Sequence, residues 1–276
     1  AAIRLLSDSV STLDLDVFYR SNGSEQKFRP LPTWVLAMNP ELRNHEILGQ
    51  VITSLLLDGN AYLATLRDDT GRVLSLSVLD PSDITPNLGT DDQGAQRLTF
   101  TSSKAAGVTL TSRDISMVRG LMKPGQIKGV SPVTAAREFL GLGIATQRFG
   151  SAFFGNGATP GSVIEVPGQL SPEGAQALKT AWNEIHQGSG NGNRLYGVPP
   201  HLLADASGST SWGSGLHEQN VAFSQYSLRP LVTRVEAALT SIMRSEGIAV
   251  AFARFDLESM RRVTADRWSS YSTAVN

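Results

Sequence analysis

Residues 129–157 read GVSPVTAAREFLGLGIATQRFGSAFFGNG and contain a long helical pattern that includes Gly141 and Gly143. Ser131 and Pro132 form the pair typical of a helix start, an N-cap residue followed by proline in the first turn. Apolar residues then recur at helical spacing for about five or six turns. The closing Gly-Asn-Gly ends the pattern. The sequence therefore predicts one long helix in the middle of the chain.

Residues 1–120 mix helical and strand patterns, which is typical of an α+β fold. Apolar steps of three and four predict a helix over 3–13. A second predicted helix begins at the Asn39-Pro40 cap and stops at Gly59, which suits a left-handed helix end. Residues 28–38 carry two prolines and predict no regular element. The predicted strands cover residues 13–19, 61–67, 72–79, 98–101, 108–111 and 115–118, of which the second and third form a β-hairpin.

The part after residue 157 predicts further elements separated by flexible loops. They are a strand at 162–166, a helix from Ser171, a glycine-rich loop at 188–193, a Ser/Gly-rich loop at 207–215, a helix at 216–245, a strand at 248–257 and a helix at 260–275. Pro230 lies inside the helix 216–245 and should bend it between Ser227 and Pro230, because proline removes an internal hydrogen bond.

The composition excludes several classes of protein. The chain has 24 Lys and Arg against 25 Asp and Glu, so it cannot bind nucleic acid by bulk positive charge. It has no Cys, which excludes disulfides, thiolate zinc sites and a Cys nucleophile, and fits a reducing compartment. No apolar run approaches the roughly 18 residues of a membrane span, and no signal peptide is predicted. We expect a trimmed fragment, because the chain lacks an initiator Met and ends inside a helical pattern.

No catalytic, cofactor or metal site is predicted. Gly120 to Gly125 has the glycine spacing of a P-loop, but Gln126 and Ile127 stand where Lys and Ser/Thr bind phosphate and magnesium. The glycine run 188–192 follows a helix instead of a strand, unlike a dinucleotide fingerprint. None of the four histidines is spaced for zinc, and no Gly-x-Ser-x-Gly elbow follows a strand.

Residues 129–142 and 148–164 resemble the stem-entry region of portal proteins of long-tailed bacteriophages. Supporting stretches occur in the family's order: DGNAY at 58–62, VPPHLL at 198–203, STSWGSGLHEQN at 209–220 and YSLRP at 226–230. The resemblance covers nearly all of the 276 residues, and no single motif carries it.

The resemblance implies a portal-type α+β fold with five parts. They are an α/β wing at 1–130, the first stem helix at 131–154, a small α/β clip at 155–194, the stem end and tunnel loop at 195–215, and a kinked tunnel helix that returns to the wing at 216–276, with the crown mostly absent.

The resemblance also implies a function. Portal proteins form a ring, usually of twelve identical subunits, at one capsid vertex, and double-stranded DNA passes through it during packaging and ejection. The implied partners are terminase, the major capsid protein and the head-completion and tail proteins, with no membrane and no cofactor. ATP hydrolysis belongs to terminase, so no enzyme activity is implied. The protein would reside in the virion after assembly in the bacterial cytoplasm, encoded by a phage or a prophage. A near-neutral chain agrees with DNA that must slide without sequence specificity.

The tunnel loop is the one candidate site that the resemblance implies. Its residues would line the channel constriction, and they are Ser209, Thr210, Ser211, Trp212, Gly213 and Ser214. The bend at Pro230 would hold this loop inward. The alternative is a plain surface loop whose Trp212 packs on a neighbouring side chain.

Two other functions are weighed against the portal interpretation. One is a hydrolase with an unrecognised carboxylate site, built around Asp68-Asp69 or Asp91-Asp92. Adjacent acids in turns are usually solvated, which disfavours this reading. The other is a connector or scaffold protein of the same virion.

A stretch of sequence near Arg194 is predicted to be missing. The family has a strand and a second long stem helix before the Val-Pro-Pro segment, whereas here Arg194 leads directly into residues 195–198. The first stem helix would then leave Leu140, Ile144 and Phe149 exposed unless a neighbouring subunit covers them. We therefore expect a break in the chain within a few residues of Arg194.

Overall fold

The computed structural model describes residues 1–91, 93–137, 195–203 and 214–258, together with residues 141, 144, 145 and 148. The helices of this part are α1 (Ala2–Ser11), α2 (Thr33–Leu36), α3 (Asn44–Asp58), α4 (Pro132–Ala135), α8 (Ser214–Ala222) and α9 (Arg229–Ser245), with a 3-10 turn η1 (Pro200–Leu203) and a π-helical segment η2 (Phe223–Leu228). The strands are β1 (Leu15–Ser21), β2 (Ser24–Lys27), β3 (Asn60–Arg67), β4 (Val73–Leu79), β5 (Ile84–Thr90), β6 (Gln96–Ser102), β7 (Ala105–Thr111), β8 (Ile115–Arg119) and β9 (Ala251–Phe255). The α+β class expected from the sequence is confirmed.

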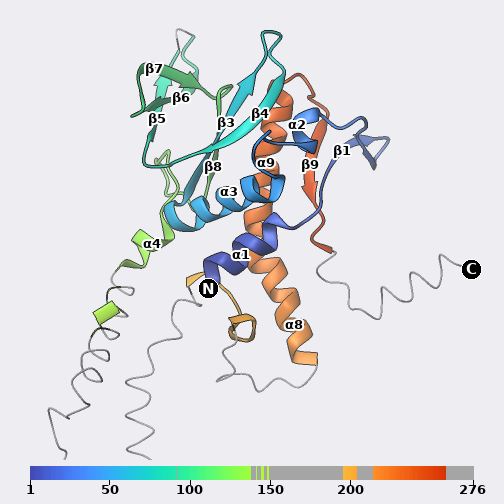
Figure 1. The fold of residues 1–276 in the computed structure, drawn as a ribbon, viewed down its shortest axis with the longest axis vertical. Coiled ribbons are helices and arrows are strands. Elements are labelled where there is room, and N and C mark those ends of the chain that lie inside the picture. Colours follow the sequence, from blue (N-terminus) through green and yellow to red (C-terminus); the bar gives the residue numbers. More distant parts are fainter. Residues whose placement is uncertain are drawn as a thin grey trace, which may run out of the picture.

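The strands form three small antiparallel sheets, ordered β2-β1-β9, β4-β3-β8 and β5-β6-β7 (Figure 1). In the first sheet, Val17 pairs with Ala253 and Leu15 with Phe255, so the beginning of the chain and the last described strand share one sheet. In the second, β3 is central and pairs with β4 on one side and β8 on the other. The fold of residues 1–119 is therefore closed by residues that follow α9.

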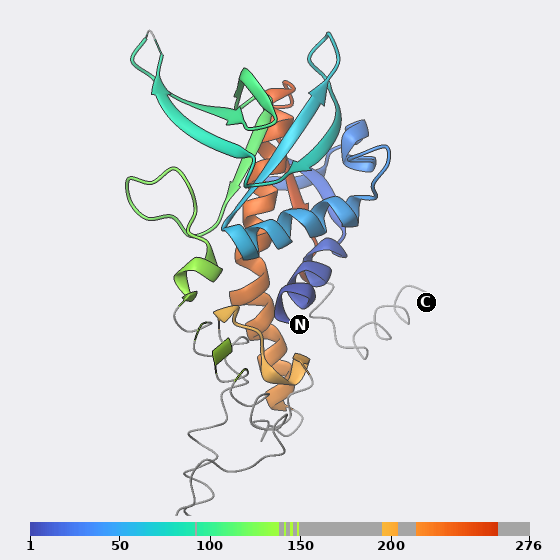
Figure 2. The ribbon, with the colours of Figure 1, turned by 60° about the vertical axis from the view of Figure 1, so that its left-hand side comes forward.

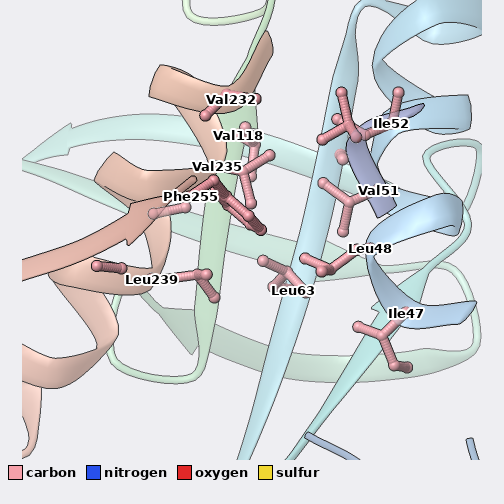
Figure 3. Packing of buried hydrophobic residues seen from close by; sticks show 14 of the residues in the cluster. Ile47, Leu48, Val51, Ile52, Leu63, Val118, Val232, Val235, Leu239 and Phe255 are labelled. Atoms are coloured by element: carbon pink, nitrogen blue, oxygen red, sulfur yellow. The ribbon is translucent and has the colours of Figure 1, made fainter. Parts of the chain in front are cut away.

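One apolar core joins these sheets to the helices. The side chains of α3 and α9 converge on β3 and β8, where Leu63 and Val118 are buried (Figure 3). Helix α3 contributes Ile47, Leu48, Val51 and Ile52, and α9 contributes Val232, Val235 and Leu239. A smaller cluster around Tyr62 and Phe100 attaches the β5-β6-β7 sheet.

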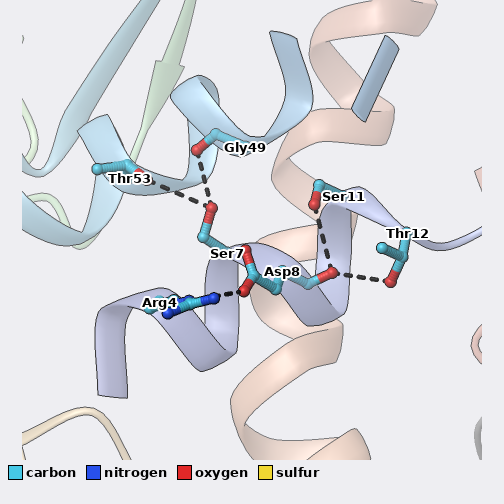
Figure 4. Close-up of polar contacts among 7 residues, drawn as sticks. All are labelled: Arg4, Ser7, Asp8, Ser11, Thr12, Gly49 and Thr53. Carbon is cyan, nitrogen blue, oxygen red and sulfur yellow. Dashed lines mark hydrogen bonds and ion pairs between the residues drawn. The ribbon is translucent and has the colours of Figure 1, made fainter. Parts of the chain in front are cut away.

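Helix α1 crosses α3 at a contact between small residues (Figure 4). The Ser7 hydroxyl donates to the Gly49 carbonyl oxygen at 3.0 Å and accepts from the Thr53 hydroxyl at 3.3 Å. A Cβ at Gly49 would lie 3.4 Å from the Ser7 oxygen, at the short end of ordinary van der Waals contact, so the two helices pack closely at this crossing.

Several predicted boundaries are confirmed, and others are wrong. Gly59 ends α3 with φ 73°, as predicted, and the Ser131 side chain accepts from Thr134 N at 3.1 Å, as expected of an N-cap. The predicted helix start at Asn39 is wrong, because α3 begins at Asn44. The Asn39 side chain instead accepts from two backbone N–H groups of a turn, and the Glu46 carboxylate accepts from Arg43 N at 2.7 Å at the true helix start.

Three short elements were not expected. They are α2 within the proline-rich stretch 28–38, β2 after the Asn22-Gly23 turn, and β5, which contains Pro86. The predicted elements at 162–166, 171–185 and 260–275, and most of the helix after Ser131, lie outside the described residues.

Candidate functional site

The candidate site is the long helix made of α8, η2 and α9, which runs from the lower end of the molecule into the core (Figure 2). Its middle turn is π-helical, because the backbone N–H of Arg229 donates to the carbonyl oxygen of Ser224, five residues earlier. Pro230 follows directly, in the first turn of α9. Proline has no N–H and clashes with the carbonyl four residues before it, and the wider π turn accommodates both effects.

The π-helical segment presents two different surfaces. Phe223, Ser224 and Leu228 are buried, whereas Tyr226 is 78 % exposed. The buried Ser224 hydroxyl has no hydrogen-bond partner among the described residues. Such an unsatisfied group costs about 1–3 kcal/mol, so Ser224 makes this turn of the helix less stable.

Residues 195–203 fasten η2 to the rest of the fold. The Ser227 hydroxyl donates to the Gly197 carbonyl oxygen at 2.7 Å, and the Tyr196 hydroxyl donates to the Leu56 carbonyl oxygen at 3.0 Å. Burial raises the pKa of Tyr196, so its hydroxyl remains a donor at neutral pH. Gly197 has φ 62°, which favours glycine. Val198 is buried in the main core.

A cavity of about 580 Å³ opens where these segments meet. Its lining is mostly apolar, with Leu6 from α1, Leu56 from α3 and Phe223 from η2. Tyr226 and Arg234 lie at the same cavity. The Arg234 guanidinium donates to the Pro230 carbonyl oxygen at 2.8 Å, so it stabilises the first turn of α9.

The structure locates part of the predicted site. Ser209, Thr210, Ser211, Trp212 and Gly213 lie outside the described residues. Ser214 was assigned to the tunnel loop but is the first residue of α8. Serine is common at helix starts, and sequence patterns leave such boundaries uncertain by one or two residues. The sequence contains no signal for the π turn other than Pro230.

The first carboxylate of each acidic pair in the hydrolase hypothesis, Asp68 or Asp91, caps a turn, and Asp92 lies outside the described residues. The Asp68 carboxylate accepts from Thr70 N and Arg72 N, and Asp91 accepts from Ala95 N and pairs with Arg97 at 2.8 Å. The pKa of Asp68 is lowered mainly by its hydrogen bond from Thr70, and that of Asp91 by its hydrogen bond from Arg97. A general acid needs a raised pKa, so this geometry gives the hydrolase hypothesis no support.

The described residues contain neither a metal-binding cluster nor a membrane-spanning helix. Within the described residues, no three His, Asp or Glu side chains come close enough to hold a metal ion. No helix within these ranges has the length and apolar character required to cross a membrane.

Comparison with known sequences gives a consistent result. A sequence model described as "Phage portal protein" matches residues 1–195 and 193–276. The "Probable portal protein" of Streptomyces phage phiC31 is 36% identical over 308 aligned residues, which cover 95% of this chain and 67% of that protein. The "Portal protein" of Enterobacteria phage HK97 is 23% identical over 305 residues, covering 94% and 70% of the two chains.

Solved structures share the fold. A chain from the neck of a native gene transfer agent particle, computed with C12 symmetry, matches with a TM-score of 0.67 and 20% identity over 99% of this chain and 82% of its own. An HK97 family phage portal protein from Corynebacterium diphtheriae matches with a TM-score of 0.57 and 14% identity, covering 94% and 92%. At these identities the likeness shows the fold alone.

Proposed function

The chain belongs to the phage portal protein family, and on that premise we propose that it is one of twelve identical subunits of a ring at a capsid vertex. The observation that carries the proposal is the family match along both parts of the chain, with 36% identity to the phiC31 relative. The resemblance expected from residues 129–164 is thereby confirmed. The C12 symmetry of the neck that contains a chain of the same fold supports twelve subunits.

In this proposal the ring conducts double-stranded DNA into and out of the capsid and has no enzymatic activity. A net charge of −1 per subunit supports this role, because weak phosphate contacts allow DNA to slide. The proposed partners are terminase, the major capsid protein and the head-completion and tail proteins, and the proposed place of assembly is the bacterial cytoplasm.

Residues 1–130 are assigned as wing, 131–154 as first stem helix, 155–194 as clip, and 195–215 as stem end and tunnel loop. The remaining residues, 216–276, form the kinked helix and the return to the wing. The pairing of β9 with β1 supports that return, because a strand that follows α9 completes the N-terminal sheet. The Ser131 cap supports the start of the stem helix.

The tunnel loop is proposed to contact DNA through Ser209 to Ser214, with Trp212 at the constriction. The position of α8 directly after this loop, with the π turn and Pro230 behind it, supports a loop held by a long helix. Trp212→Ala is expected to impair DNA packaging or retention in virions that assemble normally. Unchanged packaging and retention would assign Trp212 to packing alone.

The chain is also proposed to lack an internal segment near Arg194. The family model matches the chain in two segments, 1–195 and 193–276, and these segments meet within one residue of Arg194. The alignment with the phiC31 relative spans 308 positions, more than the 276 residues of this chain, so that relative has residues without a counterpart here. Ile144, on the predicted stem helix, is 53 % exposed. Peptide mapping by mass spectrometry of the protein from virions should find additional residues within a few positions of Arg194, whereas a peptide running directly from Asn193 to Leu195 would contradict the proposal.

The ring itself is tested on the full-length protein. Electron micrographs and mass measurement are expected to show closed rings of twelve subunits. Monomers alone at high protein concentration would overturn the proposal and return the connector or scaffold alternative to first place.

A further inference from the structure

The loop between β8 and α4 has a rigidly held base. The side chain of Asn60, which is 5 % exposed, donates to the Gly129 carbonyl oxygen at 3.0 Å and accepts from Gly129 N at 2.7 Å. Gly120 N donates to the Gly59 carbonyl oxygen at 2.8 Å. Val130 N donates to the Leu121 carbonyl oxygen at 2.7 Å and closes the loop. The loop therefore projects from the C-terminal end of α3 in a fixed direction.

The tip of this loop is also ordered. Gln126 N donates to the Lys123 carbonyl oxygen at 3.1 Å across Pro124 and Gly125, and Gly125 has φ 77°. This is the geometry of a type II turn. A segment fixed at base and tip loses little entropy on binding.

The loop surface combines apolar and basic side chains. Leu121 is 73 % exposed and Met122 is 41 % exposed. Lys123 and Lys128 are also exposed, and the loop has no carboxylate. Within the described residues neither lysine forms an ion pair. Exposed Leu and Met side chains on a preformed loop are typical of a protein contact and not of a phosphate-binding loop.

A groove of matching character lies at the other end of α3. It has a volume of about 490 Å³ and is lined by apolar side chains of Leu13, Leu15, Val35 and Leu48 together with Asp14, His45 and neighbouring polar groups. Its described lining includes a carboxylate but no lysine or arginine. Leu13, Val35 and Leu48 form its buried floor, and the surface that it offers to the loop is the partly exposed Leu15 and the exposed carboxylate of Asp14.

The loop and the groove lie at opposite ends of α3. Helix α3 crosses the molecule in both views, with the loop beside its C-terminal end and residues Asn44 and His45 of the groove at its N-terminal end (Figures 1 and 2). At 1.5 Å per residue these ends are about 20 Å apart. A closed ring requires two such unlike surfaces on each subunit, one for each neighbour.

We propose that the loop Leu121–Lys128 of each subunit docks into the groove between α1 and α3 of the next subunit, with Leu121 and Met122 against its apolar wall and the lysines near Asp14. The proposal rests on the ring proposed above and adds the contact that joins neighbouring subunits. The occupant is a second copy of this chain, because the two complementary surfaces occur on one molecule at positions where it cannot pair them itself.

Cysteine crosslinking tests the contact, because the chain has no native Cys. Met122→Cys combined with His45→Cys in the full-length protein should give a disulfide-linked ladder up to the full ring under oxidising conditions. A disulfide requires Cα atoms within about 7 Å, so no bond can form within one subunit. Each single variant is the control and should stay uncrosslinked, because like positions of successive subunits do not meet in a head-to-tail ring.

A substitution of the loop provides the second measurement. Leu121→Asp is expected to raise the protein concentration needed for ring assembly about tenfold or more, since a buried Leu contact contributes about 1.5–3 kcal/mol. Leu88→Asp on β5, where Leu88 is 48 % exposed, is the matched control and should assemble normally.

The outcomes separate this contact from the proposed function. The contact is wrong if the wild-type protein forms rings but the double variant gives no crosslink. It is also wrong if Leu121→Asp assembles as the wild type does. Either result leaves the portal function intact. A loop variant that assembles normally but alters DNA retention would indicate that the loop contacts DNA, and this result would also overturn the proposed contact between subunits. Failure of the wild-type protein to form rings would overturn both proposals.

Discussion

At the scale of single residues, backbone contacts that only glycine permits determine how α3 and β3 are joined to the segment that precedes α4. A Cβ at Gly129 would lie 2.3 Å from the Gly59 carbonyl oxygen, and a Cβ at Gly59 would lie 2.3 Å from the Val130 carbonyl oxygen. Asn60 bridges the same place with its two side-chain hydrogen bonds. The DGNAY stretch at 58–62 is thus explained by packing of backbone on backbone.

Gly129→Ala should destabilise the fold by more than about 2 kcal/mol, because the backbone atoms that it meets cannot move aside. Thermal or denaturant unfolding measures the change. Gly141→Ala is the control, since a Cβ there meets nothing within 4 Å, and it should be neutral or slightly stabilising. Equal stability of Gly129→Ala and wild type would show that this junction is loose.

Two side chains of α9 protect the outer edge of β9. The Glu236 carboxylate accepts from Phe255 N at 2.7 Å, and the Thr240 hydroxyl accepts from Ala253 N at 3.0 Å. Unpaired strand edges invite association with other chains, so these bonds prevent β9 from pairing wrongly. Burial raises the pKa of Glu236 above its usual value of 4.5, against the opposing effect of the hydrogen bond from Phe255.

The pKa of Glu236 predicts a pH dependence of stability. The contribution of Glu236 to the stability of the fold is fully present below its unfolded pKa of 4.5. It is lost as the pH rises through the raised folded pKa, because burial makes the ionised carboxylate unfavourable in the folded state. Glu236→Gln keeps an oxygen acceptor for Phe255 N and cannot ionise. Its stability relative to wild type should therefore increase between acidic and neutral pH in unfolding experiments. A difference that stays constant with pH would show that Glu236 is effectively solvated.

At the scale of elements, the long helix α8-η2-α9 is attached through its π turn to residues 195–203, which in turn contact α3. Ser227 reaches Gly197, and Tyr196 reaches the end of α3, so residues 195–203 form a clasp across the helix. In the sequence, this clasp lies between two stretches outside the described residues, 149–194 and 204–213. It therefore anchors the helix to the fold at a point close in sequence to both stretches.

Ser227→Ala removes one hydrogen bond of this clasp and should cost about 0.5–1.5 kcal/mol of stability. Ser241→Ala is the matched control, because Ser241 is exposed on α9, and it should change stability by less than about 0.5 kcal/mol. Hydrogen exchange should also become faster at Tyr196 to Val198 in Ser227→Ala. An unchanged exchange rate there would show that the clasp depends on apolar packing alone.

The elements also show what sequence patterns can predict. The hairpin β3-β4 and the glycine end of α3 were predictable because local periodicity and turn residues agree with the fold. The start of α3 was misplaced because Asn39 uses its capping group on a turn and reaches the Leu76 carbonyl oxygen at 2.9 Å, which is a tertiary contact. Strand β5 was missed because Pro86 argues against a strand, although its edge position tolerates proline. For the candidate site, Pro230 indicated an irregular helix, but the type of turn depends on packing against residues 195–203.

At the scale of the whole molecule, the described part combines a wide upper body of sheets with a long helix that descends from it (Figure 2). The pairing of β1 with β9 makes the upper body depend on both halves of the chain, so neither half completes it alone. Charge is balanced over the 276 residues, with 24 basic and 25 acidic residues. These residues therefore supply a ring with no net positive charge with which to hold DNA.

The charge balance predicts weak and weakly salt-dependent DNA binding by assembled rings. Each phosphate that Lys or Arg neutralises adds about −0.9 to the slope of log K against log salt concentration. A channel through which DNA slides should show a slope no steeper than about −3, whereas proteins that grip DNA through six or more phosphate contacts give about −5 or steeper. Labelled duplex DNA titrated with rings between about 50 and 200 mM salt measures the slope. A slope as steep as that of a gripping protein would mean that the basic side chains are concentrated along the channel, and the conduit would then need another means of letting DNA move.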